Sequence, residues 1–149
     1  MTTFDFGSGP VPAHQHPNGG GWVADTATVS ETAYVGPDAM VYDNAKVSGN
    51  ASVYGNARVS DYARVTGNAR VYGDAEVSGN AVVSSDAWVS GDAVVYGNAV
   101  VSDNVRVYGN AGVSGDAVVT GNAWVYGDAG VSGDAVVSGD AMVSGNAKG

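Results

Sequence analysis

Residues 65–82 read VTGNARVYGDAEVSGNAV, a six-residue unit of valine, a polar or aromatic residue, Gly-Asn or Gly-Asp, alanine and one variable residue, repeated three times. The valine recurs every six residues from Val23 to Val143, and four positions after it stands an alanine, except at Val105. In an extended chain the alanine and the next valine point to the same side, because side chains alternate. The Gly-Asn pair tolerates the positive φ of a sharp corner. Each unit therefore predicts one short strand and one corner.

The number of units predicts the shape of the fold. Three strands and three corners close a triangle of eighteen residues, and stacked triangles place equivalent residues in parallel ladders about 4.8 Å apart. The twenty-one units provide seven such turns. We predict an all-β protein, a triangular parallel β-helix (β-solenoid) of seven 18-residue turns over residues 22–149, with residues 1–21 as a separate amino-terminal segment. Its narrow interior explains a chain with valine and alanine but no leucine or isoleucine.

The composition argues against several other classes of protein. A chain of 149 residues is expected to form one domain, and without leucine or isoleucine it does not suit a helix bundle. The absence of cysteine excludes disulfides and cysteine metal sites, and the net charge of −9 argues against nucleic acid as a partner. No apolar run is long enough to enter and cross a membrane, and residues 1–21 lack the features of a secretory signal. We therefore expect a cytoplasmic or virion-associated protein.

The unit Val-x-Gly-(Asn/Asp)-Ala-x resembles the hexapeptide repeat of the left-handed parallel β-helix family, over residues 23–148. The resemblance implies a left-handed coil and a homotrimer, the usual state in this family. Many members are acyltransferases with a histidine base on or near an inserted loop, and some are carbonic anhydrases with three zinc-binding histidines. Residues 23–149 contain no histidine and no insertion, so no catalytic residue carries over. We expect no enzyme and no cofactor, with acyl transfer as a remaining alternative.

The favoured hypothesis is a non-catalytic rod in a virion, envelope or surface assembly. Outward residues flank each valine, and every third unit returns to the same face. One face gathers tyrosine, tryptophan and arginine, the composition of an interface core, which predicts assembly with further copies of the chain. The alternative is that these rings only stack along the ladder and stabilise neighbouring turns. The predicted interface residues are Tyr54, Tyr72, Trp88, Arg106, Tyr108, Trp124 and Tyr126.

Two alternative functions use the same outward ladders. A second face repeats Val-x-Ser or Val-x-Thr, which is similar to the Thr-x-Thr ladders of some insect antifreeze proteins built on this coil. The predicted ice-binding residues are Val82, Ser84, Val100, Ser102, Val118, Thr120, Val136 and Ser138. The aromatic face is also suited to carbohydrate, although the sequence has no specific motif for it.

Residues 1–21 depart from the repeat and allow two interpretations. Either Phe4, Phe6 or Trp22 plugs the open end of the first turn as a cap, or the proline-rich segment is an arm that docks on another structural protein. Residues 14–22 resemble the leaders of hexapeptide-repeat proteins from bacteria and their phages. His14 and His16 are weak candidates for a metal site, with Asp5 and Asp25 as further ligands.

One corner repeats aspartate and asparagine in a column that has the residue types of a cation site. The simpler interpretation is that turn geometry selects these residues. The column consists of Asp38, Asn56, Asp74, Asp92, Asn110, Asp128 and Asn146. At the other end of the repeat no capping helix follows Lys148, so we expect either that Lys148 and local charge protect the last turn or that a second copy or a partner covers it.

Overall fold

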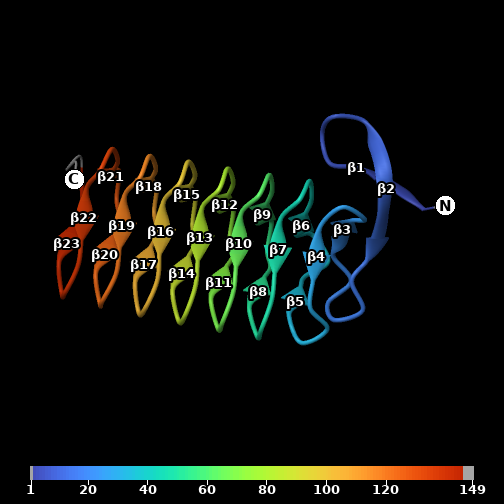
Figure 1. Ribbon diagram of the computed structural model, residues 1–149, viewed down its shortest axis with the longest axis horizontal. Coiled ribbons are helices and arrows are strands. Elements are labelled where there is room, and N and C mark those ends of the chain that lie inside the picture. The colour runs from blue at the N-terminus through green and yellow to red at the C-terminus, as the bar shows by residue number, and fades with distance from the viewer. Residues whose placement is uncertain (1, 146–149) are drawn as a thin grey trace.

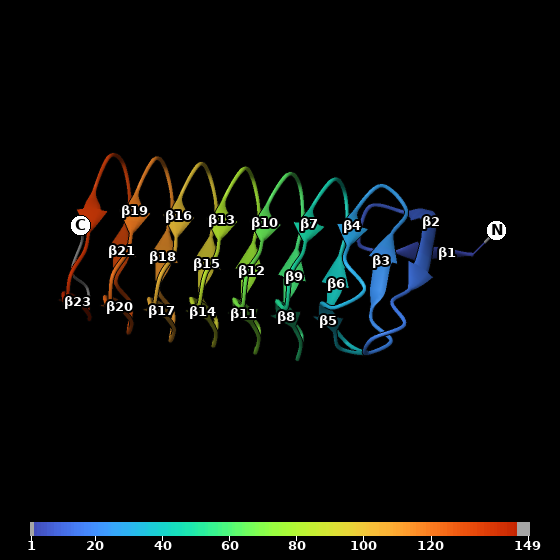
Figure 2. The same ribbon diagram turned by 60° about the horizontal axis from the view of Figure 1, so that its bottom comes forward.

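The repeat folds into a β-solenoid that is closed at its amino-terminal end by a hairpin. The structure is a computed structural model that describes residues 2–145. Figure 1 shows the turns stacked in a row with β1 (Thr3–Asp5) and β2 (Pro10–Gln15) at the amino-terminal end, and Figure 2 shows the same row after a rotation. Each six-residue unit contributes one strand, β3 to β23, and no helix occurs in the described residues. The predicted all-β parallel solenoid of about seven turns is confirmed.

Three sheets form the sides of the solenoid, and we name them by their outward residues. The cap sheet consists of β1, β2, β3 (Trp22–Ala24), β6 (Met40–Val41), β9 (Arg58–Val59), β12 (Glu76–Val77), β15 (Val94–Val95), β18 (Gly112–Val113) and β21 (Gly130–Val131). The valine sheet consists of β4 (Thr28–Val29), β7 (Lys46–Val47), β10 (Arg64–Val65), β13 (Val82–Val83), β16 (Val100–Val101), β19 (Val118–Val119) and β22 (Val136–Val137). The aromatic sheet consists of β5 (Tyr34–Val35), β8 (Ser52–Val53), β11 (Arg70–Val71), β14 (Trp88–Val89), β17 (Arg106–Val107), β20 (Trp124–Val125) and β23 (Met142–Val143).

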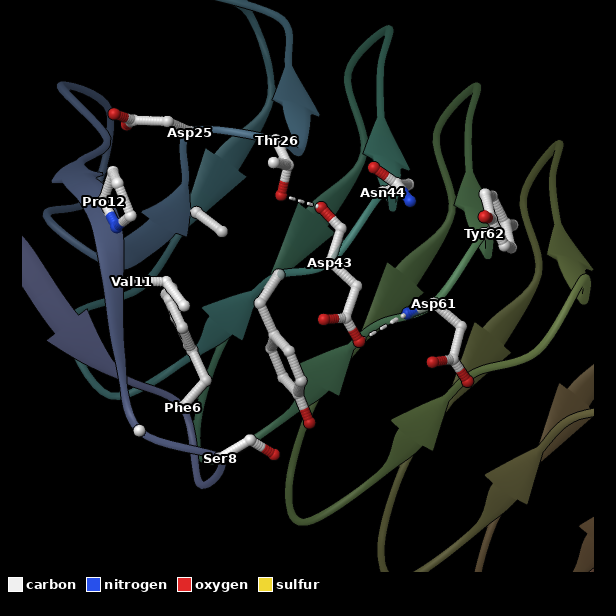
Figure 3. A pocket seen from close by; sticks show the side chains of 13 residues that line it. Phe6, Ser8, Val11, Pro12, Asp25, Thr26, Asp43, Asn44, Asp61 and Tyr62 are labelled. Atoms are coloured by element: carbon white, nitrogen blue, oxygen red, sulfur yellow. Dashed lines mark hydrogen bonds between the residues drawn. The ribbon is translucent and has the colours of Figure 1, made fainter.

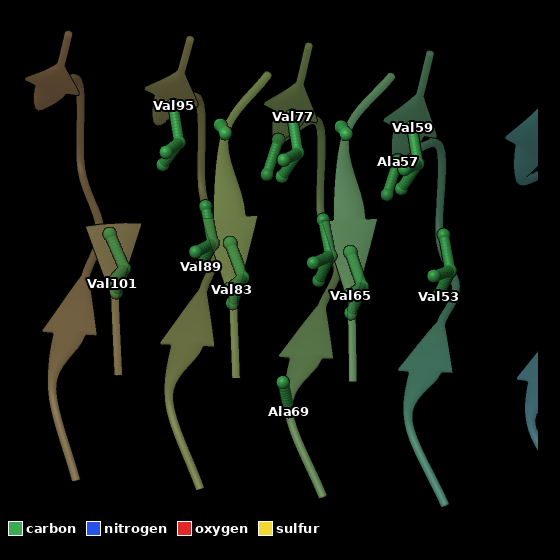
Figure 4. Close-up of a cluster of buried hydrophobic side chains, with 14 of the residues drawn as sticks. Val53, Ala57, Val59, Val65, Ala69, Val77, Val83, Val89, Val95 and Val101 are labelled. Atoms are coloured by element: carbon green, nitrogen blue, oxygen red, sulfur yellow. The ribbon is translucent and has the colours of Figure 1, made fainter. Parts of the chain in front are cut away.

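The strand register places equivalent residues one turn apart directly above each other. Val71 pairs with Val53 on one side and with Val89 on the other, in parallel ladders. The inward valines and alanines are fully buried along most of the coil, and Val105 fills its alanine position without exposure. Figure 4 shows the valines repeating from turn to turn inside the coil. Burial of each such side chain contributes about 1.5 to 3 kcal/mol, so the column of valines stabilises the whole rod.

The corners require backbone conformations that glycine adopts without strain. Gly97 has a φ of 71°, and a Cβ there would lie 2.8 Å from the nitrogen of Gly115 in the next turn. Aspartate or serine replaces glycine at four such positions, and all three aspartates accept a hydrogen bond from the next turn, of which two are short. The amide of Gly79 donates to Oδ2 of Asp61, and the amide of Gly121 donates to Oδ2 of Asp103, both at 3.0 Å. These carboxylates therefore bridge neighbouring turns.

We predict that Gly97→Ala destabilises the coil whereas Gly130→Ala does not. A residue with a side chain costs about 1 to 2 kcal/mol in the left-handed region, and the tight contact with Gly115 adds to this. Gly130 has no positive φ, and a Cβ there meets nothing within 4 Å. Thermal unfolding followed by circular dichroism checks both variants. Equal melting temperatures for the two variants would contradict the corner assignment.

The amino-terminal segment folds back on the first turn in two parts. Strand β2 runs antiparallel to β3, and β1 runs antiparallel to β2, so the hairpin extends the cap sheet. Residues 16–21 follow the edge of the aromatic sheet, where the amide of Gly21 donates to the carbonyl of Val35 and the amide of Val35 donates to the carbonyl of Asn18. Hydrogen bonds of the hairpin and of residues 16–21 therefore cover two of the three sheet edges at this end.

The aromatic residues of this segment do not form the inward plug of one of the two interpretations. Phe4 stacks on Trp22 with ring centroids 4.7 Å apart, and Phe6 stacks on Tyr42 at 5.0 Å. Trp22 and Tyr42 both occupy outward positions, so the rings cover the outer face of the cap sheet and do not plug the interior. The reason is the strand pairing, because β2 continues the sheet as an additional strand whose buried residue is the small Ala13.

Candidate interaction surfaces

The aromatic sheet carries an alternating column of arginine and tryptophan. Arg70, Trp88, Arg106 and Trp124 precede the inward valines of four successive turns. The Cζ atom of Arg70 lies 5.3 Å from the ring centroid of Trp88, and that of Arg106 lies 4.4 Å from Trp88 and 5.9 Å from Trp124. These distances are within the range of cation–π attraction, so Trp88 is held between two guanidinium groups and Trp124 is contacted by the guanidinium group of Arg106. The predicted interface residues did not include Arg70, although its spacing of eighteen residues from Trp88 places it in the same column.

A second column on this sheet carries tyrosine pairs. Tyr54 stacks on Tyr72 at 4.9 Å, and Tyr108 stacks on Tyr126 at 5.1 Å. Each pair meets a tryptophan edge-on, as Tyr72 does with Trp88 at 6.2 Å. The structure thus brings all seven predicted interface residues onto one flat face. Most of them are only half-buried in the single chain, which leaves their ring surfaces available to a partner.

Two shallow grooves lie beside these columns. The first has a volume of about 240 Å³ where Ser90 interrupts the tyrosine column; it is lined by Tyr72, Trp88, Ser90, Arg106, Tyr108 and Trp124. The second, of about 630 Å³, runs between the tryptophans and a corner; it is lined by Asn68, Arg70, Asp86, Trp88, Asn104, Arg106, Asn122 and Trp124. The second groove combines ring faces on one wall with amide and carboxylate groups on the other.

A larger groove, of about 750 Å³, lies between the amino-terminal hairpin and a corner of the first turns. Figure 3 shows Phe6, Val11 and Pro12 of the hairpin on one side and Asp43, Asp61 and Tyr62 of the corner on the other. Its complete lining is Phe6, Ser8, Gly9, Val11, Pro12, Ala24, Asp25, Thr26, Tyr42, Asp43, Asn44, Asp61 and Tyr62. Sequence reasoning missed this groove because the path of the hairpin does not follow from the repeat.

The histidines do not share a site in the structure. His14 Nδ1 lies 2.8 Å from Oδ1 of Asp25 on the surface, whereas His16 is only 4% exposed and its Nε2–H donates to the carbonyl of Ala33 at 2.8 Å. Within residues 2–145, no group of three or more metal-binding side chains lies close enough to hold an ion. The buried ring of His16 instead ties residues 16–21 to the first turn.

Two side-chain hydrogen bonds link turns within the corner column proposed for cations. Asn56 donates to Oδ1 of Asp74 at 3.1 Å, and Asn110 donates to Oδ1 of Asp128 at 3.2 Å. These asparagines therefore pair with the carboxylate of the next turn, which gives them a role that needs no cation. Asn146 lies outside the described residues.

The residues of the ice-binding alternative form two straight columns on the valine sheet. Val82 pairs with Val100, Val100 with Val118, and Val118 with Val136. Each of these valines precedes an inward valine, and Ser84, Ser102, Thr120 and Ser138 follow it. Val136 is 68% exposed, whereas Val82, Val100 and Val118 are half-buried. The geometry of this face agrees with the predicted register, and ice binding itself stays a prediction.

Comparison with known proteins supports the β-solenoid fold and does not indicate a function. The family described as YdcK beta solenoid repeat matches residues 51–67, 87–103, 101–115 and 111–127. The chain is thus similar to this β-solenoid repeat in its middle turns. No curated protein matches the chain. No solved structure matches it either. Among the described residues there is no helix long and apolar enough to span a membrane.

Proposed function

We propose that the chain is a non-catalytic structural protein, a rigid rod that assembles with further copies of itself through the aromatic sheet. The observation that carries the proposal is the unbroken column of arginine and tryptophan along four turns of one flat face, with two tyrosine pairs beside it. Tryptophan, tyrosine and arginine are the residues that most often dominate binding energy at protein interfaces. The rings are held in place by their neighbours, so little conformational entropy is lost when a partner covers them.

The proposal includes a trimer of left-handed coils, as the resemblance to hexapeptide-repeat proteins implies. A rod of this kind suits a virion, an envelope or another surface assembly, because its length and rigidity follow directly from the number of turns. The hairpin rings of Phe4 and Phe6 are packed on the chain's own cap sheet, which favours the aromatic sheet over this segment as the contact between copies.

We predict that the double variant Trp88→Ser/Trp124→Ser loses the assembly and keeps the fold. The matched control is Val82→Ser/Val118→Ser, which changes the same positions of the unit on the neighbouring valine sheet. Light scattering measures the mass of each protein, and circular dichroism reports the fold. The proposal would be contradicted if the wild-type chain were monomeric at all concentrations. It would also be contradicted if the control variant lost assembly to the same extent.

Carbohydrate binding is the second candidate, and the groove of about 630 Å³ favours it. Trp88 and Trp124 contribute aromatic surface to this groove, while Asn68, Asp86, Asn104 and Asn122 offer hydrogen-bond partners for the hydroxyl groups of a sugar. Tryptophan fluorescence during titration with a neutral polysaccharide tests this candidate. A monomeric chain whose fluorescence changes on titration would replace assembly with carbohydrate recognition, whereas unchanged fluorescence would dismiss the second candidate.

A further inference from the structure

The groove under the amino-terminal hairpin has a shape and a lining that the repeat does not require. Strand β2 is six residues long, whereas most strands of the coil have two, and it carries the hairpin beyond the corner of the first turns. The corner residues below the hairpin also depart from the repeat. Asp61 and Tyr62 stand where the next turn has Gly79 and Asn80. The hairpin and the altered corner together enclose the groove of about 750 Å³ (Figure 3).

Aromatic and aliphatic side chains make most of its surface. Phe6 and Tyr42 stack nearly parallel, with an interplanar angle of 14°. Tyr62 is 63% exposed and Val11 is 39% exposed, so both side chains present apolar surface to solvent at the groove. Corner positions elsewhere in the repeat carry short polar side chains, so a tyrosine here is not explained by turn geometry. The groove therefore offers flat rings to a ligand from two sides.

The charged side chains that line the groove are all acidic. Asp25, Asp43 and Asp61 contribute carboxylates, and no lysine, arginine or histidine occurs among the thirteen described residues that line the groove. Oδ1 of Asp25 is already paired with Nδ1 of His14 at 2.8 Å, so Asp43 and Asp61 are the main carboxylates available to a ligand. Oδ2 of Asp61 accepts a hydrogen bond from Gly79 at 3.0 Å, and Oδ2 of Asp43 lies 3.4 Å from the amide of Asp61. The other oxygen of each carboxylate has no hydrogen bond among the described residues and faces solvent. The chain as a whole carries a net charge of −9, which attracts cationic partners over a longer range.

We propose that this groove binds arginine side chains of a partner protein. A guanidinium group stacks on aromatic rings and donates paired hydrogen bonds to a carboxylate, so it uses both features of the lining at once. The ammonium group of lysine satisfies the charge but has no flat face to stack. The volume exceeds that of one side chain and is in the range of small-ligand sites, which fits a short extended segment with more than one arginine. This site is independent of the aromatic sheet and of the proposed assembly.

The test is a titration of the isotope-labelled full-length protein with tri-arginine amide. We expect chemical-shift changes at the amides of Thr26, Asp43, Asp61 and Tyr62, with binding that weakens at high salt. The neutral analogue tri-citrulline amide has nearly the same shape, and we expect it to bind much more weakly. Asp61→Asn should weaken tri-arginine binding about two- to fivefold, the range for one partly exposed charge pair. Tyr62→Ser should weaken it by a similar factor through the loss of stacking.

Asp103→Asn is the matched control for the carboxylate. Asp103 has a φ of 65°, close to the 59° of Asp61, and its Oδ2 accepts the same hydrogen bond from the next turn at 3.0 Å. It lies at a different corner, outside the groove, so we expect unchanged affinity. An equal loss in Asp103→Asn and Asp61→Asn would mean general charge attraction and would overturn the site. Equal binding of tri-citrulline, or no shift changes in the groove, would also overturn it.

Discussion

Replacement of Val89 by aspartate is expected to unfold the solenoid. Val89 has no exposed surface and pairs with Val71 and Val107 in the turns before and after it. An aspartate there would place a carboxylate in a bore lined by valine and alanine, with no polar side chain to accept it. A buried charge without a partner costs several kcal/mol, which is comparable to the whole stability of a small domain.

Ser90→Asp is the control for this prediction, because it introduces the same charge at the next residue. Ser90 points outward, so its replacement should leave the stability nearly unchanged. Circular dichroism during denaturant unfolding measures both variants. Since each turn contacts only its neighbours, a solenoid interrupted at one turn also loses cooperativity between its two halves. If the unfolding midpoint of Val89→Asp equalled that of the wild type, the assignment of Val89 to the interior would be wrong.

The coil could be predicted from the sequence because every six-residue unit forms the same short strand and corner. The spacing of Val71 from Val53 and Val89 determines which residues pair, and alternation along the strand determines which residues are buried. These two rules gave the sides of the prism, the pairing of turns and the face on which Trp88 and Trp124 lie. The seven predicted interface residues are on one face for the same reason, although their role in assembly stays a proposal.

The amino-terminal segment could not be predicted in the same way, because it has no repeat to set its register. The sequence indicates that Phe4 and Phe6 pack on the first turn. The composition does not show whether their rings plug the interior or cover the outer face of the sheet. Only the pairing of His14 with Val23 decides between them. The groove beneath the hairpin depends on that pairing, so its lining, including Tyr62 and Asp61, was also beyond sequence reasoning. The departures of Asp25-Thr26, Asp43-Asn44 and Asp61-Tyr62 from the Gly-Asn pattern at this corner were the available signal.

Replacement of both Phe4 and Phe6 by serine is expected to release the hairpin while the coil stays folded. Phe6 is nearly buried between Phe4 and Tyr42, and loss of such a ring costs about 3 kcal/mol. Removal of the Phe4 ring also removes its stacking on Trp22, which lowers the stability of the hairpin further. The hairpin makes no contact with the middle turns, so its detachment is a local opening that leaves most of the valine column intact.

Amide hydrogen exchange measures this opening residue by residue. The amides of Ala13 and Asp25 donate to the carbonyls of Thr2 and Pro12, and both should exchange faster by about a hundredfold if 3 kcal/mol of local stability is lost. The amide of Tyr72, in the middle of the coil, should keep its protection. Val11→Ser is the control on the same hairpin, because Val11 is already partly exposed. Unchanged exchange at Ala13 and Asp25 in the double variant would show that the backbone pairing of β2 with β3, and not the aromatic layer, holds the hairpin on the coil.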